Sequence, residues 1–174
     1  TIDDGVGSHI GYIEKRLLST GELCTAAACG TAFDTDGVVV SITYPYDIKV
    51  SGSYLYVYGG GSTVEKRLVS TGELCTAAAC GTAFDTDGVV TLSPVAQFAY
   101  SFDIDSTYLY TAGYDGSDWH MEKKLLTTAA ADTNFGTSSN GVATSSSASF
   151  AAYGIDLDSS YMYVFGNDGT QGRV

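Results

Sequence analysis

The sequence predicts an all-β protein made of β-propeller-like blades of four antiparallel strands. Three observations lead to this prediction: a long segment repeats almost unchanged, a Tyr-rich hairpin pattern recurs, and Gly is common where Pro is rare. The chain has 174 residues, of which 21 are Gly and 2 are Pro, and 44% are hydrophobic. This composition is typical of a folded domain with many short strands joined by tight turns.

The internal repeat is the strongest feature. The segment EKRLLSTGELCTAAACGTAFDTDGVV at 14–39 recurs at 65–90 with one change, because Val69 stands where the first copy has Leu18. A diverged third copy, EKKLLTTAAADTNFGTSSNGV, begins at Glu122. Self-similarity of this kind indicates equivalent structural units. A feature found at the same phase of every copy is therefore expected to belong to the scaffold.

A hairpin pattern accompanies the repeat. It reads YDIKVSGSYLYVYGG at 46–60, YSFDIDSTYLYTAGY at 100–114 and YGIDLDSSYMYVFGN at 153–167. In each copy an alternating segment meets a Ser/Asp turn and then a Tyr-aliphatic-Tyr alternation, which predicts a β-hairpin.

Each unit is expected to contain four strands. They are typified by residues 102–105, 108–112 and 119–126 and by a variable stretch that ends near Phe135. Four short antiparallel strands in about 50 residues match one propeller blade.

The repeats predict a single repeat region over residues 1–174. We expect a partial unit at about 1–45, full units at 46–97 and 98–150, and a partial unit at 151–174. The first partial unit holds outer strands without an inner hairpin, and the last holds an inner hairpin without outer strands. Together they supply one blade, which gives about three blades, fewer than the four that closed propellers usually need.

Unpaired strand edges are normally paired or covered. Three outcomes stay open: another copy completes the blade in a closed ring, copies add without closing into a filament, or the sequence is part of a longer array. We favour head-to-tail assembly with other copies of the chain.

The segments RLLSTGELCT…AFDTDGVV and KKLLTTAAADTNFGTSSNGVAT resemble the bacterial "delta" repeats of about sixty residues. Those repeats begin with a basic residue and Leu, continue through a Thr/Asp-Gly turn and end in Phe-Gly-Thr…Gly-Val. The chain departs from them where Asp follows Phe33 and Phe84, and in its Cys pairs. The resemblance implies propeller blades in a large bacterial surface or secreted protein, and it assigns no activity.

The four cysteines predict two disulfide bonds. Cys24 and Cys29 have the same spacing as Cys75 and Cys80, and the third unit lacks both members of the pair. Joint loss is expected of bonded cysteines, whose Cα atoms must lie about 4.4–6.8 Å apart. A four-Cys metal site is the alternative, but the spacing differs from the short C-x₂-C of zinc sites. Disulfides imply an extracellular or cell-surface location.

Composition limits the partners. Eight basic and 20 acidic residues give a formal net charge of −12, which repels phosphate backbones and anionic lipids, so we expect no nucleic-acid partner. We also expect no membrane insertion, because no apolar stretch approaches about 18 residues. The pairs Asp34/Asp36 and Asp103/Asp105 suit calcium, although solvated turns are the commoner use, and no other cofactor is expected.

One cluster is unique to a single unit and is the candidate ligand-binding site. The segment YDGSDWHM contains Asp115, Asp118, Trp119 and His120. Trp is suited to stack on a sugar and Asp and His to bind its hydroxyls or a cation. A surface turn with a packed indole is the simpler interpretation.

The tyrosines offer a second candidate. Tyr54, Tyr56 and Tyr58 share one face of a predicted strand. They are either buried between blades or exposed as a sugar-stacking or fibre-contact row.

The sequence contains no nucleophile elbow, P-loop or H-E-x-x-H motif, so we predict no catalytic residue. The first functional hypothesis is an extracellular structural or adhesive protein that is not an enzyme and that assembles with itself. The second is a carbohydrate-binding propeller. The third is a non-catalytic segment of a secreted hydrolase or lyase.

Overall fold

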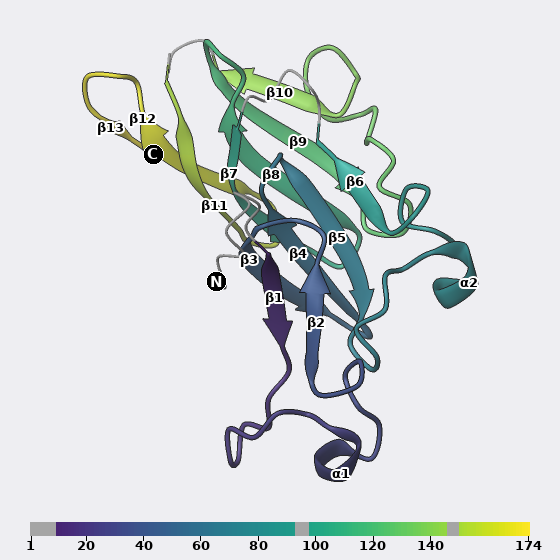
Figure 1. Cartoon of the computed structure of the whole chain (residues 1–174). Coiled ribbons are helices and arrows are strands. Elements are labelled where there is room, and N and C mark those ends of the chain that lie inside the picture. The colour runs from purple at the N-terminus through teal and green to yellow at the C-terminus, as the bar shows by residue number, and fades with distance from the viewer. Residues whose placement is uncertain (1–9, 93–97, 146–149) are drawn as a thin grey trace.

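The structure is a computed structural model that describes residues 10–92, 98–145 and 150–174. These residues form antiparallel β-sheets and two single-turn helices (Figure 1). The prediction of an all-β fold is confirmed. A closed propeller is not detected in the described part of the chain, and no helix there is long and apolar enough to cross a membrane.

Four sheets follow one another along the chain. Sheet 1 pairs β1 (Gly11–Glu14) with β2 (Val38–Ser41). Sheet 2 has the order β3 (Pro45–Ser51), β4 (Tyr54–Gly59), β5 (Thr63–Leu68), β6 (Val89–Thr91). Sheet 3 has the order β7 (Phe98–Ile104), β8 (Tyr108–Tyr114), β9 (Trp119–Leu125), β10 (Val142–Ser145). Sheet 4 contains β11 (Ala152–Leu157), β12 (Met162–Asn167) and the short β13 (Gly172–Arg173).

The sheets are equivalent in register. In the outer strands Glu14 lies opposite Val38, Glu65 opposite Val89 and Glu122 opposite Val142. In the inner hairpins a β-bulge falls at the same place three times, between Pro45 and Asp47, between Ala99 and Ser101, and between Ala152 and Gly154. A residue in one sheet can therefore be matched to its counterparts in the others.

The predicted position of the fourth strand was wrong. The stretch ending near Phe135 is a loop, and the strand follows it as β10, just as β2 and β6 follow Phe33 and Phe84. In each unit a glycine N–H donates to the carbonyl of this Phe, from Gly37, Gly88 and Gly141 in turn. These glycines have positive φ, which favours Gly and ends the loop, so the strand starts beyond it. Phe33 and Phe84 are buried between sheets.

The two disulfides are confirmed. Cys24–Cys29 and Cys75–Cys80 have Cα atoms 5.4 and 5.3 Å apart. Each loop contains one helical turn, α1 (Ala26–Cys29) and α2 (Ala77–Cys80), in which the hydroxyl of Thr25 or Thr76 accepts an N–H as an N-cap. A helix this short does not persist alone, so the disulfide and the cap hold it.

Apolar cores fill the spaces between successive sheets. Between sheets 1 and 2 the core contains Ile13, Cys24, Phe33, Val39, Leu55 and Val57. Between sheets 2 and 3 it contains Tyr56, Tyr58, Val64, Cys75, Phe84, Val90, Leu92, Ala99, Phe102, Leu109, Leu126 and Ala129. Between sheets 3 and 4 it contains Ala112, Trp119, Met121, Ala152 and Ile155. Each sheet is therefore stabilised by its neighbours.

The disulfides should contribute equally to stability. Replacing both members of either pair by Ala removes a short covalent loop, which we expect to lower the free energy of unfolding by about 2 kcal/mol. Denaturant unfolding of the C24A/C29A and C75A/C80A variants measures this. Unchanged midpoints in both variants would contradict the expectation.

Candidate functional site: two open ends and a tyrosine pocket

The indole of the predicted ligand-binding cluster packs inside the structure. Trp119 is 6% exposed, and its Nε1 donates to the Asn167 carbonyl at 2.9 Å, which links β9 to sheet 4. Asp115 accepts the N–H groups of Ser117 and Asp118 and so closes the turn before β9. Burial raises the pKa of Asp115, but these hydrogen bonds outweigh it and the pKa lies below the usual range. The indole face is not available for stacking on a sugar.

His120 lies inside the structure. Its Nε2 is 3.1 Å from Oε1 of Glu122, and Lys124 Nζ is 3.3 Å from the other carboxylate oxygen. Nδ1 of His120 is buried without a hydrogen-bond partner in the described residues. Nor do these residues contain a group of three or more His, Cys, Asp or Glu side chains placed to hold a metal ion.

A buried ionic contact joins sheets 1 and 2. Glu65 is fully buried on β5, and its Oε1 accepts from Ser41 Oγ at 2.6 Å and from the Thr43 N–H at 2.9 Å. Its Oε2 pairs with Arg67 Nε at 2.7 Å, and Arg67 also donates to the Val40 carbonyl at 3.1 Å. The end of β2 is thereby fixed to β5 through a satisfied charge pair.

The same pair on sheet 1 lacks that neighbour. Arg16 and Glu14 are 2.7 Å apart, and Arg16 donates to the Gly21 carbonyl just as Arg67 donates to Gly72. Their side chains, however, are 49% and 46% exposed. The contacts within the unit form, but the described residues provide no preceding sheet for this pair to contact.

Two nearly identical segments also differ in strand length. β5 runs through Leu68 because every residue from Thr63 pairs with β4. β1 stops at Glu14, and the described part of the chain offers no inner strand to pair with the residues that follow. Leu18 is fully exposed, whereas the matching Val69 packs on the core and donates its N–H to Ser53. We call sheet 1 and the adjoining face of β3 the open N-terminal end.

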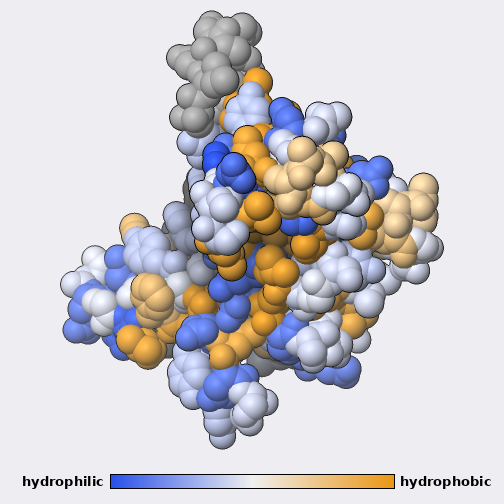
Figure 2. Space-filling view, turned by 90° about the horizontal axis from the view of Figure 1, so that it is seen from below, coloured by the Kyte–Doolittle hydropathy of each residue, from blue (hydrophilic) through white to orange (hydrophobic). Residues whose placement is uncertain are grey.

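The other end of the row is open as well. On β12, Tyr163 and Phe165 are 50% and 54% exposed, whereas their counterparts on β4, Tyr56 and Tyr58, are buried. β13 pairs only with Gly166 and Asn167, which leaves the rest of that strand edge unpaired within the described residues. We call this surface of sheet 4 the open C-terminal end. Exposed hydrophobic residues also form a band on the underside of the molecule (Figure 2).

A third feature is a pocket that the sequence analysis missed. The extra residue of each β-bulge is a tyrosine, and Tyr46, Tyr100 and Tyr153 are 62%, 42% and 41% exposed. The signal in the sequence is the tyrosine that opens each hairpin pattern. It is distinct from the row of Tyr54, Tyr56 and Tyr58, of which Tyr56 and Tyr58 are buried and Tyr54 is partly buried.

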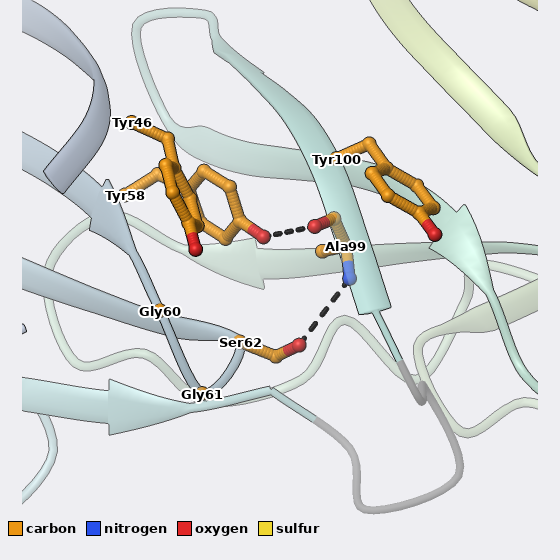
Figure 3. Close-up of a pocket in the computed structure, with 7 residues that line it drawn as sticks. All are labelled: Tyr46, Tyr58, Gly60, Gly61, Ser62, Ala99 and Tyr100. Carbon is orange, nitrogen blue, oxygen red and sulfur yellow. Dashed lines mark hydrogen bonds between the residues drawn. The ribbon is translucent and has the colours of Figure 1, made fainter. Parts of the chain in front are cut away.

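Two of these tyrosines face each other across a cavity of about 400 Å³ (Figure 3). The lining consists of Tyr46, Tyr58, Gly60, Gly61, Ser62, Ala99 and Tyr100. Tyr58 donates to the Ala99 carbonyl, and Ser62 Oγ accepts the Ala99 N–H at 3.2 Å, so sheets 2 and 3 are joined at the pocket floor. The lining carries no carboxylate and no basic group, so it suits a neutral ligand.

Comparison with protein-family models, curated proteins and solved structures gave no match to this chain.

The two copies of the glutamate allow a matched prediction. Replacing Glu65 by Ala leaves Arg67 buried without its partner and should lower the free energy of unfolding by about 3–5 kcal/mol. Replacing Glu14 by Ala, in the same sequence context but in water, should change it by less than about 0.5 kcal/mol. Chemical denaturation distinguishes the two, and equal losses would contradict the assignment.

Tyr58 should make stability fall at alkaline pH. Burial, followed by the charges of Tyr46 and Tyr100, raises the pKa of Tyr58 to about 12. An unfolded Tyr ionises near pH 10, so the folded chain holds this proton more tightly. The free energy of unfolding should thus be unaffected below about pH 10 and fall between about pH 10 and 12.

The Tyr58→Phe variant should lack that part of the alkaline fall, although it begins about 1 kcal/mol lower because it loses a hydrogen bond. Denaturant unfolding between pH 8 and 12 compares the two chains. Identical pH dependence would be the contradicting result.

Proposed function

We propose that the chain is an extracellular structural or adhesive repeat protein without catalytic activity, and that copies assemble head to tail by completing propeller-like blades. One observation carries the proposal: near-identical segments adopt different structures because only one has an inner hairpin beside it. The segment at β5 is paired and buried, whereas β1 is short and Glu14, Arg16 and Leu18 of its segment are exposed.

The missing hairpin has the form of sheet 4. On β4, Val57 lies opposite Glu65 and Tyr58 opposite Val64. By the same register β1 of a second copy adds to β12 with Glu14 opposite Val164 and Ile13 opposite Phe165. This is strand addition at an exposed edge, in which main-chain hydrogen bonds supply affinity. A head-to-tail contact of this kind gives a ring if the rotation closes and a filament if it does not.

The two disulfides and the resemblance to bacterial surface repeats support an extracellular location. Disulfides persist in oxidising compartments. The high negative charge keeps copies soluble and slows their association at low ionic strength.

Assembly should depend on concentration. Sedimentation velocity at physiological ionic strength is expected to show species larger than a monomer that increase with protein concentration, and negative-stain electron microscopy is expected to show rings or filaments. A monomer at every concentration would overturn the proposal.

A second candidate function is carbohydrate binding, and the tyrosine pocket favours it. Tyrosine rings stack on the apolar faces of sugars while their hydroxyls remain available for hydrogen bonds. The exposed Tyr46 and Tyr100 stand on opposite sides of a neutral cavity (Figure 3), which suits a neutral saccharide.

The saccharide candidate is tested with a panel of neutral hexasaccharides built from glucose, xylose, mannose or N-acetylglucosamine. Calorimetric titration is expected to detect binding to at least one of them, and Tyr100→Ala should weaken it by about tenfold or more. Tyr12→Ala, at an exposed tyrosine of sheet 1, is the matched control. No heat with any sugar, or equal effects of both substitutions, would remove this candidate.

A further inference from the structure

We infer that two side chains lock neighbouring copies together, and that each is received by a cavity already present in the chain: Tyr163 enters a socket at the open N-terminal end of the next copy, and Leu18 of that copy enters a cavity at the open C-terminal end. This inference rests on the proposed head-to-tail assembly and identifies the residues that make the contact.

The socket at the open N-terminal end resembles the core between sheets 2 and 3 without its Tyr56. A cavity of about 250 Å³ there is lined by Glu14, Lys15 and Arg16 and by the apolar side chains of Ile13, Phe33, Ile48, Val50, Leu55 and Val69. Register and repeat match only the apolar side chains, one by one, to Val64, Phe84, Phe102, Ile104, Leu109 and Leu126, which surround Tyr56 between sheets 2 and 3. Among residues 10–92, 98–145 and 150–174, sheet 1 has no inner hairpin to supply a tyrosine.

The exposure of β3 reflects the same vacancy. Ile48 and Val50 are 46% and 65% exposed, although Phe102, the counterpart of Ile48, is completely buried. Phe102 is covered by Tyr58 of the preceding sheet, since the two ring centroids are 5.9 Å apart. No equivalent of Tyr58 among the described residues covers Ile48.

Tyr163 is the matching projection. It occupies the position of Tyr56, since Tyr56 lies opposite Lys49 and Tyr163 opposite Asp156 in equivalent hairpins. Its hydroxyl donates to Asp158 at 2.7 Å, as the hydroxyl of Tyr110 donates to Asp105. Tyr110 keeps this bond while it packs against sheet 4, so Tyr163 can keep its own inside the socket.

The reciprocal contact involves Leu18. A cavity of about 270 Å³ between sheets 3 and 4, next to the open C-terminal end, has a partly polar lining of Asp105, Asp158, Ser159, Ser160 and Tyr161. The rest of its lining consists of Tyr110, Lys123, Phe135, Leu157 and Met162. These positions match Tyr56, Lys66, Phe84, Ile104 and Leu109, which enclose Leu126 one interface earlier. Leu18 is the repeat equivalent of Leu126, and it is fully exposed.

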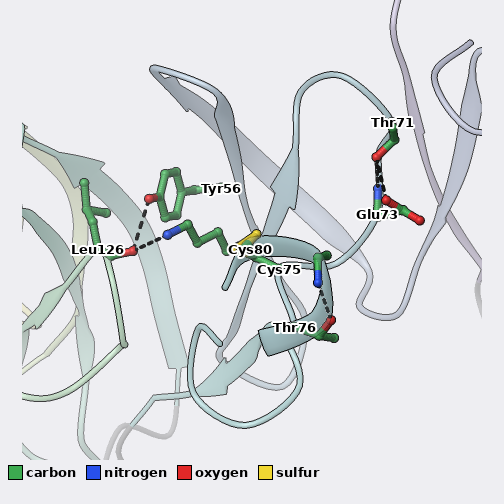
Figure 4. Close-up of a disulfide and its surroundings, with 9 residues drawn as sticks. Tyr56, Thr71, Glu73, Cys75, Thr76, Cys80 and Leu126 are labelled. Atoms are coloured by element: carbon green, nitrogen blue, oxygen red, sulfur yellow. Dashed lines mark hydrogen bonds between the residues drawn. A yellow bond between two sulfur atoms is a disulfide. The ribbon is translucent and has the colours of Figure 1, made fainter. Parts of the chain in front are cut away.

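In two of the three repeats, a lysine donates a hydrogen bond to the backbone carbonyl of the residue equivalent to Leu18. Lys66 Nζ donates to the Leu126 carbonyl at 2.8 Å, and the Tyr56 hydroxyl donates to the same oxygen (Figure 4). Lys15 makes the equivalent bond to the Val69 carbonyl at 3.0 Å. Lys123, the third in the series, lies 3.9 Å from the centroid of the Tyr108 ring and 2.8 Å from Asp132. An ammonium group has three donors, so Lys123 can also bind the Leu18 carbonyl of the second copy.

Two blocked variants test the inference together. Leu18→Glu places a carboxylate in a cavity whose lining already contains the carboxylates of Asp105 and Asp158. Tyr163→Glu places one against the apolar side chains of the socket and near Glu14. Both residues are exposed in the single chain, so folding should be unchanged by circular dichroism. Each variant alone is expected to associate at least about 100-fold more weakly than wild type.

Mixing the Leu18→Glu and Tyr163→Glu chains should restore one intact interface between two copies. The Leu18→Glu chain keeps an intact C-terminal end, and the Tyr163→Glu chain keeps an intact N-terminal end. Sedimentation velocity of an equimolar mixture is therefore expected to show a one-to-one dimer and nothing larger.

Two controls come from the chain itself. Leu18→Val should assemble like wild type, because Val fills the same position at residue 69. Ala78→Glu should also assemble normally, since Ala78 is exposed on α2, in a loop of sheet 2 away from both open ends.

The outcomes are distinguishable. If the wild-type chain assembles and either blocked variant assembles equally well, or if the mixture stays monomeric, this inference is wrong and head-to-tail assembly stands. If the wild-type chain is monomeric at every concentration, both are overturned, because no second copy then occupies the cavities.

Discussion

The structure depends on the burial of each sheet by the next one along the chain. A four-stranded sheet of short strands cannot bury both faces by itself. Here the inner hairpin turns a tyrosine row toward the following sheet, and Tyr56 and Tyr58 on β4 are buried as a result. Burial of a large aromatic side chain contributes more than the local preferences of short strands, so the order of the repeats in space decides which residues are core.

Charged residues take part in the same packing. On β5 Glu65 and Arg67 face the preceding sheet and satisfy each other and the end of β2, while Lys66 points to the other side. Lys66 is buried with Nζ 4.1 Å from the centroid of the Tyr54 ring, and burial lowers its pKa. Alternation along one strand thus gives each neighbouring sheet a polar contact as well as an apolar one. The Glu-Lys-Arg segment serves the scaffold, as its recurrence in the sequence suggested.

The sequence predicted those features of the fold that recur in each repeat and depend on nearby residues. The repeat placed the inner hairpins and the third strand correctly and paired the cysteines, because these features depend on residues close together in the chain. It did not place the fourth strand, because Phe has a high strand propensity and the turn in which Gly141 donates to the Phe135 carbonyl is visible only in the structure. The role of Trp119 was also out of reach, because its partner Asn167 lies in another sheet.

That a residue occurs in one repeat alone was a weaker guide to a functional surface than a difference in exposure between equivalent residues of two repeats. Trp119 is the only tryptophan and His120 one of two histidines in the sequence, yet both are buried. Glu14 and Glu65, by contrast, are followed within the repeat by sequences that differ only at Leu18 and Val69. Intrinsic propensity, turn chemistry and side-chain volume are therefore almost constant after these two residues, while the neighbouring sheet differs. Any change in strand length or exposure between them must then arise from tertiary contact. Comparison of repeats thus separates local from tertiary effects, and the positions where equivalent residues differ in exposure are those where the described residues place no sheet beside them.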